Sequence, residues 1–311
     1  MSNKLAKKPK VLVILGPTSG GKTALGVRLA FELSGEIISA DSRQVYRGMD
    51  IGTGKDLGEY TVEGKNIPYH LIDIVSPNTN FNLAKYQRLA TKAIEKTIAR
   101  GNLPIIVGGT GLYLQSLVDN YALANGKSDL KLRAELELLG ADRLFTNLKN
   151  QAPDFADKLN NSDRNNPRRL ARYLELAAEG RLSEIGKRAA KYDFLILGTL
   201  RDDEDLRKRI SDRRREMIEK EGLVEEVNHL HKKSVSWKRL ISFGLEYKFV
   251  SWFLMGKMDY DTMCSKLDTE ICQFAKRQKT WFKRWENQGT KINWVKSLGE
   301  ARRISSDWLK K

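Results

Sequence analysis

The segment GPTSGGKT, at residues 16–23, constrains the fold of this chain more than any other. It fits the pattern G-x-x-x-x-G-K-[ST], and it directly follows residues 11–15, a short run of valine, isoleucine and leucine typical of a buried strand. In such a phosphate-binding loop (P-loop), glycines let backbone N–H groups surround phosphate oxygens at the start of a helix. Lys22 adds positive charge and Thr23 can bind Mg²⁺. The segment therefore predicts a phosphate site, made of Gly16, Pro17, Thr18, Ser19, Gly20, Gly21, Lys22 and Thr23.

Strand and helix patterns alternate on both sides of a long central segment. Further strands are expected at 36–40, 103–107 and 194–200, and a helix at 83–100 with Gly101 after its last turn. This order predicts an α/β fold, with a P-loop NTPase-like parallel sheet as the core and helices on both faces. From 119 to 191 the pattern is only helical, so we expect a helical insertion there. Residues 9–118 and 192–311 would form the core.

The charge of the chain favours a polyanionic partner. Its 311 residues include 55 Lys and Arg against 39 Asp and Glu, a formal net charge of +16. No apolar run approaches the length of a membrane span, so we expect a cytoplasmic protein with no membrane partner. Cys264 and Cys272 have no nearby histidine and are expected to be ordinary buried thiols.

An acid at the end of the second predicted strand is a candidate for chemistry. Asp41 falls at the carboxyl edge of the sheet, where open α/β folds bind ligands. It could bind Mg²⁺, cap a helix or accept a proton. The signature of a nucleotide hydrolase is incomplete, because the strand IIVGGT ends without an acid and only Asp73, in LIDI, is available.

Helical spacing places an arginine on an apolar face. In a helix over 204–221, Leu206, Ile210 and Met217 form one stripe with Arg213 in its middle. A buried guanidinium needs a partner, so Arg213 should meet either an acid or a bound phosphate. Arg209, one turn earlier, could reach the same anion.

Two further helices carry basic residues that suit RNA. In a helix over 268–286, Arg277 and Arg284 flank Trp281, an arrangement that suits single-stranded RNA or, alternatively, a core tryptophan beside a solvated face. Gln278, on the apolar face, needs a partner. In the insertion, Arg168 and Arg172 should lie on the exposed side of a helix that begins after Asn166.

Six ordered segments together resemble the tRNA dimethylallyltransferases (tRNA isopentenyltransferases). They are GPTSGGKT, ISADSRQVYRGMDIGTGK, LIDI, PIIVGGTGLYLQSL, NPRRLARYLE and AKRQKTWFKRW, and they span nearly the whole chain. In that family the loop holds dimethylallyl diphosphate rather than ATP. The prenyl group goes to N6 of the adenine 3′ of the anticodon, in tRNAs that read codons beginning with U.

The resemblance implies roles for individual residues. Residues 18–23 would grip the diphosphate, Asp41 would be the general base, and Thr110 and Arg133 would support the transfer. Apart from the resemblance, the position of Arg213 on its helix leads us to expect that it neutralises the leaving diphosphate together with Lys22. The residues expected to contact tRNA are Asp41, Ser42, Arg43, Gln44, Arg168, Arg169, Leu170, Ala171, Arg172, Arg239, Arg277, Trp281 and Arg284.

The expected partners are dimethylallyl diphosphate and the tRNA anticodon stem-loop, with Mg²⁺ held by Thr23 as the cofactor, and we expect a monomer. The sequence departs from the family pattern at FGLEYKFV, which replaces the commoner Gly-Tyr-Lys-Glu. Three alternatives remain: an ATP-using nucleoside or small-molecule kinase, a P-loop RNA-binding protein without activity, and a prenyltransferase that acts on adenylate.

Overall fold

A parallel sheet forms the centre of the computed structural model, which describes residues 7–123, 133, 135–136 and 138–311. The sheet has six strands in the order β10-β9-β1-β6-β2-β5. Their bounds are Lys10–Leu15 (β1), Gly35–Ser39 (β2), Tyr69–His70 (β5), Leu103–Gly108 (β6), Asp193–Thr199 (β9) and Asn293–Val295 (β10). The predicted α/β fold with a parallel core is confirmed.

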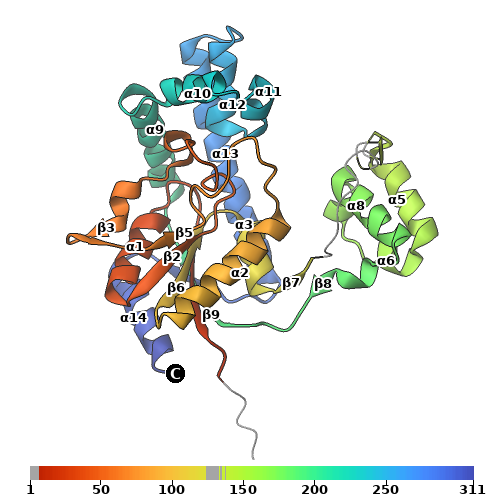
Figure 1. Cartoon of the computed structure of the whole chain (residues 1–311), viewed down its shortest axis with the longest axis horizontal. Helices are drawn as coiled ribbons and strands as arrows, with labels where there is room; N and C mark the ends of the chain where they lie inside the picture. The colour runs from red at the N-terminus through yellow and green to blue at the C-terminus, as the bar shows by residue number, and fades with distance from the viewer. Residues whose placement is uncertain (1–6, 124–132, 134, 137) are drawn as a thin grey trace, which may run out of the picture. The chain divides into compact units, whose positions relative to one another are not determined.

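Helices cover both faces of the sheet (Figure 1). On one face, Leu12 and Ile14 pack with α1 (Lys22–Glu32) and α14 (Leu298–Leu309). On the other, Val11 and Val13 pack with α2 (Leu83–Ala99), α3 (Gly111–Val118) and the end of α13 (Tyr260–Asn287). Side chains of β1 alternate between the faces, as strand geometry requires, and both faces are buried.

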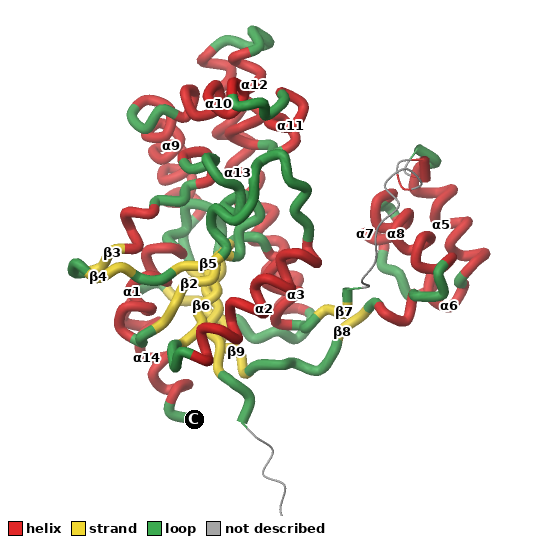
Figure 2. The backbone as a smooth tube through the Cα atoms, in the orientation of Figure 1, coloured by secondary structure: helices red, strands yellow, loops and turns green. Residues whose placement is uncertain are grey.

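A separate helical cluster stands over the carboxyl end of the sheet (Figure 2). It contains α9 (Asp203–Glu219), α10 (Leu223–Lys232), α11 (Trp237–Ser242), α12 (Leu245–Leu254) and most of α13. Its core also takes in Val45, Tyr46 and Met49 from the loop that follows β2. This packing brings α9, α12 and α13 next to the loop that carries Asp41.

The contacts divide the chain into two units, one of Met1–Val118 with Ala190–Lys311 and one of Asp119–Ala189. The second unit contains α5 (Gly140–Gln151), α6 (Pro153–Asp157), α7 (Asn161–Arg164) and α8 (Pro167–Ala178). The short strands β7 (Tyr121–Ala122) and β8 (Gly186–Lys187) pair at its base. Leu144, Leu148 and Leu170 form its own small core.

Small elements complete the first unit. They are η1 (Ile51–Thr53), η2 (Leu57–Tyr60) and the hairpin of β3 (Thr61–Val62) and β4 (Lys65–Asn66). The second unit also contains η3 (Leu182–Glu184). None of the helices in the described part of the chain has the length and apolar character to cross a bilayer.

The segment LIDI lies just after the sheet: β5 ends at His70, and Leu71 and Asp73 have positive φ angles of 65° and 56°. Two local expectations change. The last long helix, α13, begins at Tyr260, eight residues before its predicted start, because Asp259 caps it. Cys264 and Cys272 are free thiols but only half-buried.

Candidate active site

One cavity of about 750 Å³ opens at the carboxyl edge of the sheet. Its walls come from the P-loop, the loops that follow β2 and β6, and helices α9, α12 and α13. The predicted site residues in its lining are Thr18, Ser19, Gly21, Lys22, Thr23, Asp41, Ser42, Arg43, Gln44, Thr110, Arg209, Arg213, Arg277 and Trp281. The structure therefore brings residues from six parts of the sequence to the edge where α/β folds bind ligands.

The P-loop has the backbone shape of an anion site. Ser19 and Gly21 have left-handed φ angles of 55° and 81°, which turn successive N–H groups toward one side. Gly16 is buried against β9, where a Cβ atom would lie 2.1 Å from Oγ1 of Thr199. Because no larger residue fits there, the loop stays close to the sheet and α1 starts directly beyond it.

Lys22 is held under this loop. Its ammonium donates a hydrogen bond to the backbone oxygen of Pro17 at 2.6 Å. Burial lowers the pKa of Lys22 from 10.5 to about 8, although the negative charge of Asp41 works in the opposite direction. An anion bound in the loop would favour the charged form of this lysine.

Asp41 forms a turn at the end of β2. Its Oδ1 atom accepts hydrogen bonds from the backbone N–H groups of Arg43, at 2.8 Å, and Gln44, at 3.3 Å. The neighbouring N–H of Ser42 donates to Oγ1 of Thr110 at 3.1 Å, which ties this turn to the loop after β6. Both bonds to Asp41 use the same oxygen. These bonds stabilise a turn and not a helix, because the next helical element, η1, begins only at Ile51. The role of Asp41 as a general base stays a prediction.

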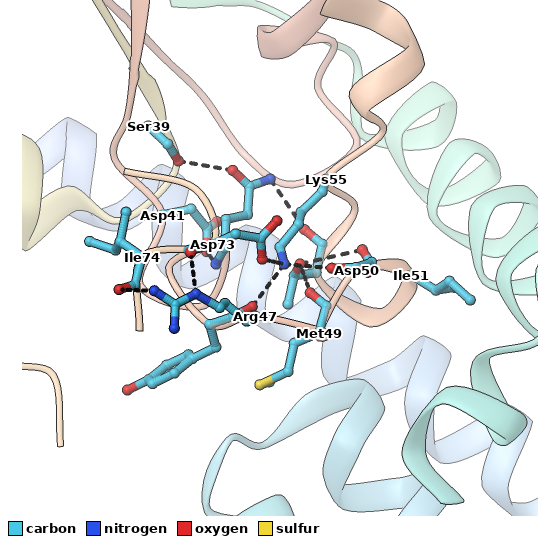
Figure 3. Close-up of polar contacts among 12 residues, drawn as sticks. Ser39, Asp41, Arg47, Met49, Asp50, Ile51, Lys55, Asp73 and Ile74 are labelled. Carbon is cyan, nitrogen blue, oxygen red and sulfur yellow. Dashed lines mark hydrogen bonds and ion pairs between the residues drawn. The ribbon is translucent and has the colours of Figure 1, made fainter. Parts of the chain in front are cut away.

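A buried lysine holds the loop that follows Asp41 (Figure 3). Lys55 is only 1% exposed and forms ion pairs with Asp73 and, at 2.6 Å, with Asp50. It also donates to the backbone oxygen of Tyr46 at 2.8 Å. Asp73, the acid considered above for a nucleotide hydrolase, is therefore the partner of a structural lysine. Residue spacing alone carried no signal for this network.

The side-chain amide of Gln44 forms hydrogen bonds within the same region of the chain. Its Nε2 donates to the backbone oxygens of Thr53 and Gly54, at 3.3 and 3.1 Å, and its Oε1 accepts from Ser39. Both ends of the amide thus hold the protein together. The expected contact of Gln44 with RNA is not favoured by this geometry.

Arg43 faces an acid that the sequence analysis did not identify. Glu246 lies on α12, is only 8% exposed, and lines the cavity. Its Oε2 atom lies 3.6 Å from Nη1 of Arg43, whose guanidinium also stacks over Phe274. Burial raises the pKa of Glu246, and Arg43 counteracts this only in part. The departure FGLEYKFV from the family pattern was the sequence feature that could have drawn attention to Glu246, because it contains this glutamate two positions after Gly244.

The two α9 arginines expected to reach the anion have different environments. Arg209 reaches the P-loop, where its Nε donates to the backbone oxygen of Ser19 at 3.4 Å. Arg213 is half-buried, and its guanidinium forms ion pairs with Asp56, Glu216 and Glu221. The acid-pair alternative therefore describes Arg213 in this structure. Its predicted role at the diphosphate is untested.

The two tryptophans of α13 also differ. Trp285 is fully buried in the core, whereas Trp281 lines the cavity and packs so closely on Gly111 that a Cβ there would lie 2.4 Å from its ring. The exposed Arg284 stacks on the ring of Trp281 at 4.4 Å. Trp281 and Arg284 thus keep the arrangement expected for RNA binding, whereas Trp285 is a core residue.

Arg239 has a structural position. Its guanidinium donates to the backbone oxygens of Pro77 and Thr79, at 2.7 and 2.9 Å, and lies 4.4 Å from the ring centre of Phe243. Because these contacts occupy the guanidinium, it is poorly placed to bind RNA. The predicted tRNA contact of Arg239 is not favoured by this structure.

In the insertion, three predicted arginines form ion pairs with acids of the same unit. Arg133 and Arg172 both form ion pairs with Glu175, at 2.7 and 2.8 Å. Leu170 and Ala171 are 0% exposed, so the prediction that their side chains contact tRNA is wrong. They were included only because they lie within the matching block. The other two arginines of that block are Arg168, which is exposed, and Arg169, which pairs with Asp163.

Comparisons with known proteins agree with this arrangement. A family model described as IPP transferase matches residues 44–285. The tRNA dimethylallyltransferase 1 of Syntrophus aciditrophicus is 45% identical over 289 residues, which cover 92% of this chain and 93% of that protein. The chain belongs to the tRNA dimethylallyltransferase (IPP transferase) family.

Solved structures of family members have the same fold. The tRNA isopentenylpyrophosphate transferase of Bacillus halodurans is 32% identical, with a TM-score of 0.70 and 97% of each chain covered. A eukaryotic dimethylallyltransferase acting on tRNA is 27% identical, with a TM-score of 0.76, and covers 97% of this chain and 80% of its own. The family resemblance drawn from the sequence is confirmed, and the kinase alternative is not favoured.

Proposed function

We propose that this protein transfers a dimethylallyl group from dimethylallyl diphosphate to N6 of the adenine 3′ of the anticodon, in tRNAs that read codons beginning with U. The observation that carries the proposal is the shared cavity, in which the P-loop and Asp41 line the same space. A phosphate site and a carboxylate in one cavity suit a reaction in which diphosphate leaves as an amine loses a proton.

The reaction balances with the groups present. The adenine amine forms a bond to C1 of the allyl group while the C1–O bond breaks and its electrons leave with diphosphate. Asp41 takes the proton from nitrogen. Lys22 and Arg209 stabilise the growing negative charge on the leaving group, because both lie at the P-loop. The target base must leave its stack to enter the cavity.

We also propose Mg²⁺ as the cofactor. Thr23 lines the cavity and offers a hydroxyl oxygen, the kind of ligand that Mg²⁺ prefers. Among the described residues, no cluster of His, Cys, Asp and Glu has the makings of a metal site by itself. The metal would therefore take most of its ligands from diphosphate oxygens and only a few from the protein. When bound, it would neutralise negative charge on the leaving group.

The experiment is a labelling assay with two acceptors. The protein is incubated with labelled dimethylallyl diphosphate and either tRNA or AMP, with the Asp41→Ala variant as control. Label in tRNA that is lost in the variant supports the proposal. Phosphorylation of a nucleoside by ATP, without prenyl transfer, contradicts it. Sedimentation of the same sample tests the expected monomer.

A further inference from the structure

A buried glutamine on α13 connects the two sides of the cavity. Gln278 is only 7% exposed. Its Oε1 accepts a hydrogen bond from the backbone N–H of Thr18 at 2.8 Å, and its Nε2 donates to the backbone oxygen of Gly109 at 2.9 Å. Because one partner is a donor and the other an acceptor, only one orientation of the amide satisfies both.

The glycine at position 109 permits this contact. A Cβ atom at Gly109 would lie 2.3 Å from Nε2 of Gln278, a distance that no side chain could tolerate without moving the amide. The fit is therefore mutual: the glutamine reaches the loop because residue 109 has no side chain. Gly109 keeps an ordinary backbone conformation, so its need for glycine comes from this approach and not from a positive φ angle.

Of the two loops that Gln278 joins, one would bind the diphosphate and the other is tied to the turn that holds the proposed general base. Thr18 lies in the P-loop, which would hold the diphosphate. Gly109 precedes Thr110, whose Oγ1 accepts from the N–H of Ser42, the residue after Asp41. One amide thus links the loop of the electrophile to the turn of the proposed general base.

We propose that Gln278 is a positioning residue that fixes the distance between the diphosphate loop and the Asp41 turn. This inference rests on the proposed function. Both polar ends of Gln278 are occupied by backbone groups, so it acts through the two loops. Because the N–H of Thr18 donates to Gln278, it follows that the diphosphate is held by the other N–H groups of the P-loop. A displacement of about 1 Å between reacting groups can cost on the order of a hundredfold in rate.

The test compares Gln278→Met with Gln273→Met. Methionine keeps the length of residue 278 but removes both hydrogen bonds, and Gln273 is an exposed glutamine on the same helix. We expect Gln278→Met to lower kcat about 10- to 100-fold while KM for both substrates stays within about threefold. Gln273→Met should match the parent protein. An unchanged kcat in Gln278→Met, or a loss wholly explained by a smaller folded fraction, would overturn the proposal.

A second test uses the contact between Gln278 and Gly109. Gly109→Ala should be harmful in the parent protein but add less than about threefold to the loss in Gln278→Ala, where the space is free. Losses that multiply would contradict the coupling.

Amide hydrogen exchange separates this inference from the proposed function. In Gln278→Met, exchange at the N–H of Thr18 should become faster, whether or not the protein transfers a prenyl group. A parent protein without transfer activity would reject the proposed function, and unchanged exchange at Thr18 would reject the positioning role.

Discussion

The charge of Lys22 should make diphosphate binding depend on pH in the range 7–9. Burial lowers the pKa of Lys22 to about 8, so the free protein holds it mostly charged at pH 7 and mostly neutral at pH 9. The shift from 10.5 corresponds to about 3 kcal/mol of lost preference for the ammonium form. A bound diphosphate favours that form and should raise the pKa again.

The expected magnitude follows from this pKa. If only the charged form binds, the Kd for inorganic diphosphate rises about tenfold from pH 7 to pH 9. At pH 9 the complex should also take up close to one proton, about 0.9, on binding. Calorimetry in buffers with different ionisation enthalpies measures this number directly, without Mg²⁺ and without tRNA.

The matched control is Lys22→Arg. Its guanidinium stays charged at pH 9, so the variant should show only the titration of diphosphate itself. The difference between the two proteins isolates Lys22. Equal proton uptake at pH 9 in parent and variant would refute the argument that burial suppresses the lysine's charge.

Other residues give further tests. Arg100 lowers the pKa of Glu36 from 4.5 to about 2, a shift worth about 3 kcal/mol of folding free energy. This contribution should be complete above pH 4.5 and should be lost as the pH falls toward 2. In denaturant titrations, the free energy of unfolding of Glu36→Gln should therefore depend less on pH over this range than that of the parent protein. Lys55→Met should lower the free energy of unfolding in urea by about 2 kcal/mol. This is less than the loss of one partner of a fully buried ion pair would cost, because both carboxylate partners of Lys55 are partly exposed to solvent. An unchanged unfolding midpoint would contradict this. Arg284→Ala should reduce the salt dependence of tRNA binding by about 0.7 in log–log slope, whereas Arg302→Ala, which breaks a surface ion pair between α14 and Glu32 of α1, should not. Equal slopes in the two variants would exclude a phosphate contact at Arg284.

Local sequence patterns predicted the elements that carry the site. The P-loop and the strand before Asp41 are short segments whose structure depends on neighbours in the chain, and both were placed within one or two residues. The register of the sheet then puts their carboxyl ends at one edge. For that reason the meeting of Lys22 and Asp41 in one cavity was predictable without knowledge of the whole fold.

Contacts between distant segments were not predictable in the same way. Helical spacing showed that Gln278 and Arg213 needed partners, but Thr18 lies 260 positions from Gln278, and no periodicity connects them. Arg213 had two possible partners, and only the packing of α9 against the loop that carries Asp56 decides between them. Leu170 and Ala171 were misassigned because a matching block was carried over as a whole, although the helix buries both side chains.

The central claim is that Asp41 accepts the proton of an adenine held beside the P-loop, and a single-turnover measurement on Asp41→Asn tests it most directly. Asparagine keeps an oxygen able to accept from the N–H groups of Arg43 and Gln44, so the turn should persist. With both substrates bound, prenyl transfer should slow by about 10²- to 10⁴-fold while the Kd for tRNA stays within a few-fold. Transfer at the rate of the parent protein would contradict the account.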